Sequence, residues 1–266
     1  MEMIMQKHSV VPLTCLAALV VVTASASVLA QSQHDWSAAP HWTYAGATGP
    51  DHWGAMDPRF TACGKGKDQS PIDLESRDAK SGKNGAFHIA YEKTDVALVN
   101  NGHTIQANVK DPNDTVTLDG DTYHLAQFHF HTPSEHTTDG QRYKLEAHFV
   151  NEDSNKRALV VGVLVREGKP NPGLAPVFSQ LPASEESASN QPISVDLASV
   201  LPKDHRAFVY TGSLTTPPCT EGVHWVVLEQ PIEMSREQID SFARIFHANN
   251  RPLQKANGRE IDDESE

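Results

Sequence analysis

Hydrophobic residues alternate with polar ones in short runs along most of the chain after residue 85. Alternation is typical of β-strands, because successive side chains of a strand point to opposite faces of the sheet. We expect strands at residues 86–91, 96–101, 104–109, 115–118, 123–131, 144–151, 157–166, 207–211 and 223–228. Turn sequences such as Asn101-Gly102 and Asp119-Gly120 separate several runs, which favours a mainly antiparallel sheet.

Helical periodicity is scarce and occurs late in the chain. Residues 174–181 fit a short helix, and Ser235 is a suitable N-cap for a helix that continues to about His247. Residues 31–70 are rich in Trp, His, Gly and Pro, which predicts an irregular segment packed over the domain. The acidic residues 260–266 are expected to fray at their end.

The first thirty residues have the pattern of a secretory signal peptide. Lys7 precedes an apolar run over residues 10–22, which is shorter than the roughly 20 residues that a membrane-spanning helix needs. Small residues follow it, as before a cleavage site. We therefore expect residues 1–30 to be cleaved, residues 31–266 to form a single domain without a membrane anchor, and the protein to be periplasmic or secreted.

Charge and cysteine content agree with an exported protein. The net charge of −12 argues against nucleic acid or an anionic membrane as a partner. Beyond the first thirty residues the cysteines are Cys63 and Cys219, and in an oxidising compartment two cysteines most simply form a disulfide. The alternative is a pair of free, buried thiols.

The most specific chemical feature is a set of histidines on two of the predicted strands. Gln127, His129 and His131 share one face of the first strand, and Glu146 and His148 share one face of the second. If the strands are neighbours, three imidazoles converge, which suffices for a catalytic zinc that keeps its fourth position for water. The alternative without a metal is an exposed strand face that carries histidines by chance.

Several blocks along the chain, taken with these histidines, resemble the α-class carbonic anhydrases. The blocks are Trp42 with Tyr44, Gly49-Pro50-Asp51-His52-Trp53, Gln69-Ser70-Pro71-Ile72, Asn100-Asn101-Gly102-His103, Gln127-Phe128-His129-Phe130-His131, Ser134-Glu135-His136, Glu146-Ala147-His148, Gly212-Ser213-Leu214-Thr215-Thr216-Pro217-Pro218, Trp225, Arg251-Pro252-Leu253-Gln254 and Asn257-Gly258-Arg259. They follow the family's order over nearly all of residues 31–266, and agreement between independent motifs supports one reading.

The resemblance implies a mainly β fold, with a central, twisted, mostly antiparallel sheet of about ten strands and a few short peripheral helices. It implies Zn²⁺ held by His129, His131 and His148, with Gln127 and Glu146 accepting the second N–H of two ligands. The implied reaction is the reversible hydration of carbon dioxide to bicarbonate and a proton, by attack of a zinc-bound hydroxide. The partner of His131 is expected to be a backbone carbonyl group.

The resemblance also assigns roles to residues outside the histidine set. Glu135 and Thr215 match the pair that orients the hydroxide, and His103 matches the position that shuttles the proton to buffer. The implied carbon dioxide site consists of Val150, Val160, Leu214, Thr215, Thr216 and Trp225. The residues implied to order the water between zinc and the shuttle are Tyr44, Asn101 and Gln106.

The expected partners are carbon dioxide and bicarbonate, with sulfonamides and anions as inhibitors, and exported bacterial relatives are often homodimers. Hydrolysis of esters is a plausible side activity. One alternative is a non-catalytic binding module on the same fold, although such relatives have lost zinc ligands that this chain keeps. Another is an exported protein that buffers zinc or holds it structurally, which would need a fourth protein ligand.

Overall fold

The computed structural model describes residues 40–111, 113–189 and 191–266. The predicted signal peptide, residues 1–30, lies outside the described residues, as do the first residues of the predicted domain. In the part of the chain that is described, none of the helices combines the length and the apolar character needed to cross a bilayer.

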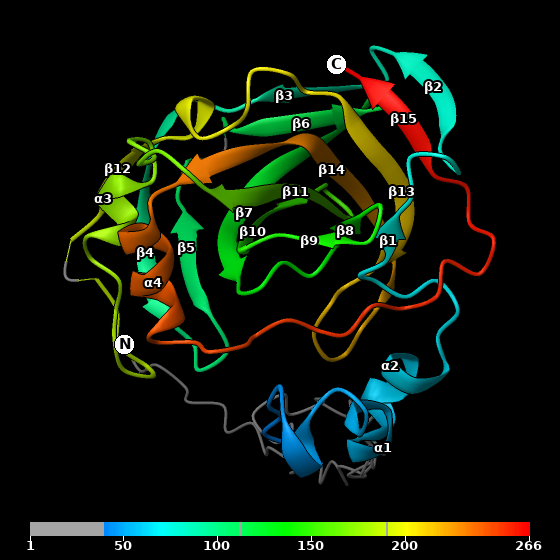
Figure 1. The fold of residues 1–266 in the computed structure, drawn as a ribbon, viewed down its shortest axis with the longest axis horizontal. Helices are drawn as coiled ribbons and strands as arrows, with labels where there is room; N and C mark the ends of the chain where they lie inside the picture. The colour runs from blue at the N-terminus through cyan, green and yellow to red at the C-terminus, as the bar shows by residue number, and fades with distance from the viewer. Residues whose placement is uncertain (1–39, 112, 190) are drawn as a thin grey trace, which may run out of the picture. The chain divides into compact units, whose positions relative to one another are not determined.

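Among the described residues, twelve strands form one large sheet (Figure 1). Ten of them follow one path in the order β12 (Ile193–Asp196), β4 (Lys93–Asn100), β5 (Ile105–Val109), β7 (Asp121–His131), β10 (Leu145–Glu152), β11 (Ala158–Glu167), β14 (Glu221–Met234), β13 (Ala207–Ser213), β15 (Asp262–Ser265) and β2 (Lys80–Asn84). The other two, β3 (Phe87–Ala90) and β6 (Thr115–Leu118), join through β7. The pairs β11–β14 and β15–β2 are parallel and the remaining pairs are antiparallel, so the predicted fold class is confirmed.

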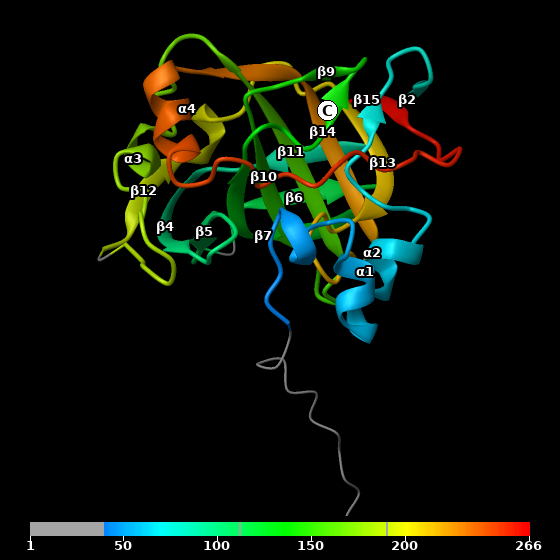
Figure 2. The ribbon, with the colours of Figure 1, turned by 60° about the horizontal axis from the view of Figure 1, so that its bottom comes forward.

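Short elements surround this sheet (Figure 2). A second, three-stranded sheet contains β1 (Asp73–Leu74), β8 (Thr137–Thr138) and β9 (Gln141–Arg142). The helices are α1 (Trp53–Met56), α2 (Thr61–Lys65), α3 (Ala175–Phe178) and α4 (Arg236–Ala243), with 3-10 turns η2 (Gly46–Thr48), η3 (Pro58–Phe60) and η4 (Leu197–Ser199). Both views show α3 and α4 together beside β12, away from α1 and α2.

Two expectations about the late part of the chain need correction. Ser235 does cap α4, because its side chain accepts the N–H of Gln238 in a capping box, but the helix ends at Ala243 rather than near His247. Residues 262–265 do not fray, because their backbone pairs with β13 and β2. Their acidic side chains carry no hydrophobic alternation, so the pattern of the sequence does not reveal this strand.

The central strands divide their side chains between a hydrophobic core and a polar face. Phe128 and Phe130 of β7 and Phe149 of β10 are fully buried in the main core, and the rings of Phe128 and Phe149 lie 5.2 Å apart. The alternate residues of the same strands face the other side and include the three histidines. A shift of one residue in pairing would exchange the two faces, so the apolar face fixes the register of the histidines.

Candidate metal centre

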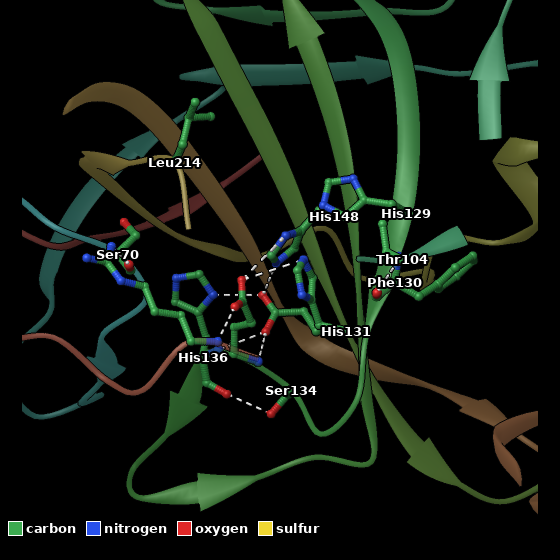
Figure 3. A network of polar contacts seen from close by, with 12 residues as sticks. Ser70, Thr104, His129, Phe130, His131, Ser134, His136, His148 and Leu214 are labelled. Atoms are coloured by element: carbon green, nitrogen blue, oxygen red, sulfur yellow. Dashed lines mark hydrogen bonds and ion pairs between the residues drawn. The ribbon is translucent and has the colours of Figure 1, made fainter. Parts of the chain in front are cut away.

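The three predicted histidines meet on the polar face of β7 and β10 (Figure 3). His129 pairs directly with His148 across the strands, and His131 pairs with Glu146. The ring of His131 lies 5.0 Å from that of His129 and 4.5 Å from that of His148. One nitrogen from each ring can be chosen so that all three lie within 4.8 Å of one another.

His129 and His148 each use one ring nitrogen within the protein and leave the other toward the shared space. Nδ1 of His129 donates to the side-chain oxygen of Gln127 at 2.8 Å, which leaves Nε2. Nε2 of His148 donates to Oε1 of Glu146 at 2.9 Å, which leaves Nδ1. Gln127 and Glu146 thus make the contacts that the sequence predicts for them.

His131 is held by a residue that sequence reasoning did not identify. Its Nδ1 donates to the backbone carbonyl of Asn249 at 2.6 Å. The side-chain amide of Asn249 donates to the carbonyl groups of Phe130 and His103, so one residue connects β7 to the His103 turn. Nε2 of His131 is buried and has no hydrogen-bond partner, which leaves a lone pair directed into the shared space.

All three imidazoles are electrically neutral near pH 7. Burial, reinforced by the neighbouring histidines, holds the pKa of His129 well below its usual range. Burial lowers the pKa of His131 to about 4 and also lowers the pKa of His148. Neutral imidazoles are the form that binds zinc, so the residues fit this metal in number, charge and free lone pairs.

Glu146 connects the histidine set to a buried chain of hydrogen bonds. Its carboxylate accepts the ring N–H of His136 at 2.7 Å and the backbone N–H groups of Glu135 and His136 at 2.8 Å each. The other ring nitrogen of His136 bonds the Tyr210 hydroxyl at 2.7 Å, and that hydroxyl bonds Ser70 at 2.8 Å. Burial alone would raise the pKa of Glu146, but the histidines lower it overall, so the carboxylate is ionised.

Glu135 lies fully buried beside the histidines. One carboxylate oxygen accepts the backbone N–H of Arg251 at 2.6 Å, and the other lies 3.6 Å from Nε2 of His131 and 3.9 Å from Nδ1 of His148. Burial raises the pKa of Glu135 to about 7, although His148, the Arg251 N–H and the Thr215 hydroxyl each lower it. Thr215 is thus near enough to Glu135 to lower its pKa, while the second carboxylate oxygen of Glu135 is buried without a hydrogen-bond partner.

An apolar row crosses the sheet next to the histidines. Val150 of β10 pairs with Val160 of β11, which pairs with Trp225 of β14. Val160 and Trp225 are buried, Val150 and Leu214 are half-buried, and all four belong to one hydrophobic cluster. Thr215 and Thr216 follow Leu214 directly.

The remaining predicted residues lie around His103 and on β5. The ring of His103 stacks on Trp42, with centroids 3.6 Å apart and planes 7° apart. The side-chain oxygen of Asn101 accepts the N–H groups of His103 and Thr104, so it closes this turn. The Tyr44 hydroxyl is buried without a hydrogen-bond partner. Gln106 pairs across the sheet with His129.

The predicted pairing of Cys63 with Cys219 is confirmed, with a Cα–Cα distance of 5.0 Å. The disulfide joins α2 to the segment that carries Thr215 and Thr216. The N–H of Cys219 donates to the carbonyl group of Thr216 at 2.8 Å, and the Gln69 amide donates to the carbonyl group of Cys219 at 3.0 Å.

Sequence reasoning missed the supporting roles of Asn249, Tyr210, Ser70 and Arg251. Each of them acts through a contact with residues far away in the chain, and none belongs to a periodic pattern of ligands. Ser70 and Arg251 do stand in blocks that carry the family resemblance, which is the one signal that could have indicated them.

Comparisons with known proteins agree with this site. The family model described as eukaryotic-type carbonic anhydrase matches residues 48–265. The chain is 42% identical to a carbonic anhydrase of Pectobacterium carotovorum over 83% of this chain and 90% of the relative, and 41% identical to one of Neisseria gonorrhoeae over 83% and 87%. A solved α-carbonic anhydrase of Thermovibrio ammonificans, in complex with sulfanilamide, matches with a TM-score of 0.80 and 42% identity, covering 83% of this chain and 98% of that chain. The chain therefore belongs to the eukaryotic-type, or α, carbonic anhydrase family.

Proposed function

We propose that this protein is a zinc-dependent carbonic anhydrase that catalyses the reversible hydration of carbon dioxide to bicarbonate and a proton. The observation that carries the proposal is the convergence of three neutral imidazoles, one of which has a buried ring nitrogen without any partner. Family membership supports the reaction, and the donor set supports the metal.

The metal would be held by Nε2 of His129, Nε2 of His131 and Nδ1 of His148, the nitrogens that no protein group uses. When bound by three protein ligands, Zn²⁺ supplies a hydroxide nucleophile near neutral pH because it lowers the pKa of water to about 7. Gln127, Asn249 and Glu146 fix the three rings in orientation, which is the usual task of groups behind metal ligands.

Glu135 and Thr215 would orient the attacking oxygen. Glu135 already accepts the backbone N–H of Arg251 with one oxygen, so its other oxygen is available to the Thr215 hydroxyl proton. A hydroxyl group whose proton is committed in this way can only accept a further hydrogen bond. The lone pair of the attacking oxygen is then directed toward the carbon of the substrate, which is catalysis by orientation.

Carbon dioxide is small and apolar, and the row of Val150, Val160, Leu214 and Trp225 offers it a dry wall beside the histidines. The backbone N–H of Thr215 is the proposed donor to one substrate oxygen, and Thr216 completes the site. Pockets for small molecules commonly combine an apolar lining with a few polar groups that set orientation.

The proton that hydration releases would leave through His103, since imidazole is the side chain that titrates near neutral pH. Tyr44, Asn101 and Gln106 would order the water on the way. The side-chain oxygen of Asn101 is engaged in the turn, so its contribution would come from the amide nitrogen.

The proposal is tested by measuring carbon dioxide hydration on the purified protein, after removal of zinc by a chelator and after its return. We expect activity to disappear and then to recover in proportion to the zinc bound. Activity without metal would contradict the proposal. The absence of activity with one zinc bound per chain would also contradict it and would favour the zinc-buffering alternative. The same samples assayed with an activated ester test the side activity, which should follow zinc in parallel.

Sulfonamides should inhibit this protein, since a relative with the same fold is known in complex with sulfanilamide. We also propose that residues 1–30 are removed on export, that residues 31–266 form a single domain, and that the mature protein is periplasmic or secreted. The Cys63–Cys219 disulfide supports an oxidising compartment. Sequencing of the N-terminus of the exported protein tests the cleavage.

A further inference from the structure

A loop that is distant in sequence, residues 182–189, is hydrogen-bonded to the turn that carries His103. The backbone N–H of Asn100 donates to the carbonyl group of Ser187 at 2.9 Å, and the N–H of Glu186 donates to the carbonyl group of Asn100 at 2.8 Å. The side-chain amide of Asn100 adds a bond to the carbonyl group of Pro182 at 3.0 Å. Three bonds on one residue fix the loop against the turn.

This attachment places the carboxylate of Glu185 against the turn, one residue before His103. A methyl carbon built on Gly102 would lie 2.4 Å from Oε1 of Glu185, closer than real side-chain carbons approach other atoms. Gly102 also has a φ of 82°, which favours glycine. The glycine therefore permits both the turn and the close approach of the carboxylate.

Among the described residues, Glu185 is the acidic side chain whose charge raises the pKa of His103. Trp42 covers one face of the imidazole, and the ring of His41 lies 5.8 Å from it. Tyr44 and His247 line a cavity of about 250 Å³ together with His103. Tyr44 is neutral because burial raises the pKa of its hydroxyl well above the usual value, and the two histidines can only add positive charge.

We propose that Glu185 is a positioning residue for proton transfer, because its carboxylate stabilises the protonated form of His103 during turnover. The inference rests on the proposed role of His103 as the proton shuttle. Burial and His41 lower the pKa of His103, and Glu185 opposes them. A proton acceptor works best when its pKa is close to that of the donor and to the working pH, so the carboxylate keeps the shuttle effective.

The test is Glu185→Gln in the zinc-loaded protein, assayed at low ionic strength in a weak buffer. We expect kcat for hydration to fall about two- to threefold, the effect of losing one exposed charge next to the His103 turn. The ratio kcat/KM should stay unchanged, because encounter with carbon dioxide precedes proton release. The kcat for dehydration should not fall in parallel, because a more acidic His103 returns its proton inward more readily.

Three controls isolate the charge of Glu185. Glu186→Gln removes an equal charge from the next residue of the same loop, Glu185→Asp keeps the charge, and both should behave like the wild type. Salt at about 0.5 M should bring the wild type toward Glu185→Gln, because it screens exposed charges. NMR titration should show a lower His103 pKa in Glu185→Gln and an unchanged His103 pKa in Glu186→Gln.

The outcomes separate the inference from the function on which it rests. His103→Ala should lose turnover in weak buffer and recover it in imidazole buffer. If His103→Ala behaves in this way while Glu185→Gln and Glu186→Gln have equal kcat for hydration, Glu185 has no role in proton transfer. If His103→Ala keeps full turnover in weak buffer, the shuttle itself is wrong and the role of Glu185 falls with it.

Discussion

Glu146 joins His148, a proposed zinc ligand, to the buried hydrogen bonds behind it, so its substitution tests how strongly the protein orients the proposed ligand. Both carboxylate oxygens of Glu146 accept N–H groups. In Glu146→Gln an NH2 group replaces one of these oxygens and cannot accept them, so at least one hydrogen bond is lost. We expect the affinity for zinc to fall about 10- to 100-fold, as is typical when a group behind a metal ligand is changed, and zinc to be released faster. The measurement is the rate of zinc transfer to a chromogenic chelator.

Glu152→Gln is the matched control, because Glu152 lies at the end of the same strand and pairs with Lys156 on the surface. It should release zinc at the wild-type rate. Equal rates in all three proteins would mean that Glu146 does not orient His148.

Single residues differ in how far the sequence reveals their partners. Gln127 with His129 and Glu146 with His148 are two positions apart on one strand, so alternation alone places each pair on one face. The partner of His131 is Asn249, which is 118 positions away and bonds through its backbone. Backbone carbonyl groups have no sequence signature, so this contact could be expected in kind but not assigned to a residue.

The disulfide links two elements of the fold, α2 and the segment after β13. Its contribution to the free energy of unfolding can be measured directly. It closes a loop of 156 positions, so it restricts the unfolded chain strongly. We expect the double variant Cys63→Ala and Cys219→Ala to lose about 2–5 kcal/mol of unfolding free energy in urea titrations. In wild-type protein treated with a strong reductant the cross-link is broken but both cysteine side chains remain. The comparison therefore separates the effect of the cross-link from the effect of lost packing.

Both the double variant and the reduced protein should unfold at lower urea than the oxidised wild type. If reduction leaves the midpoint unchanged while the double variant loses stability, packing in the cluster with Trp53 and Phe60 accounts for the effect instead. A further readout is carbon dioxide hydration, which reports whether the Thr215 segment keeps its position.

Elements were predictable where they have one buried and one polar face. The strands that carry the site, expected at residues 123–131 and 144–151, are observed at Asp121–His131 and Leu145–Glu152. The alternation that predicts them is the same feature that buries Phe128 and Phe149 opposite the histidines. By contrast, β15 is acidic and forms through backbone pairing with its neighbours, a tertiary effect that its own residues do not encode.

The site as a whole depends on contacts between distant parts of the chain. Arg251 is almost fully buried, and its guanidinium group donates to the carbonyl groups of Ser70 and Cys63, 181 and 188 positions away. Its backbone N–H meanwhile fixes Glu135. Periodicity predicts neither contact, since it describes only neighbours along the chain. Ser70, Glu135 and Arg251 stand in blocks of the family resemblance, which is the one sequence signal that could have indicated this long-range packing.

Removal of zinc tests how far the fold depends on the metal that we propose. The main hydrophobic core lies on the opposite face of the central strands from His129, His131 and His148, so the metal-free protein should remain folded. At a free zinc concentration about a thousand times the dissociation constant, binding adds roughly 4 kcal/mol to the free energy of unfolding. In a domain of this size we therefore expect calorimetry to show Tm lower by on the order of 10 °C without zinc.

The variant His129→Ala is the control, because it lacks one of the three proposed ligands and should gain little stability from added zinc. Identical transitions with and without zinc in the wild type would exclude tight binding to the native state. A metal-free protein without a cooperative transition would show that zinc is needed to complete the fold. We do not expect that result, because burial keeps the three close imidazoles neutral without the metal. They therefore do not repel one another and need no ion to hold them together.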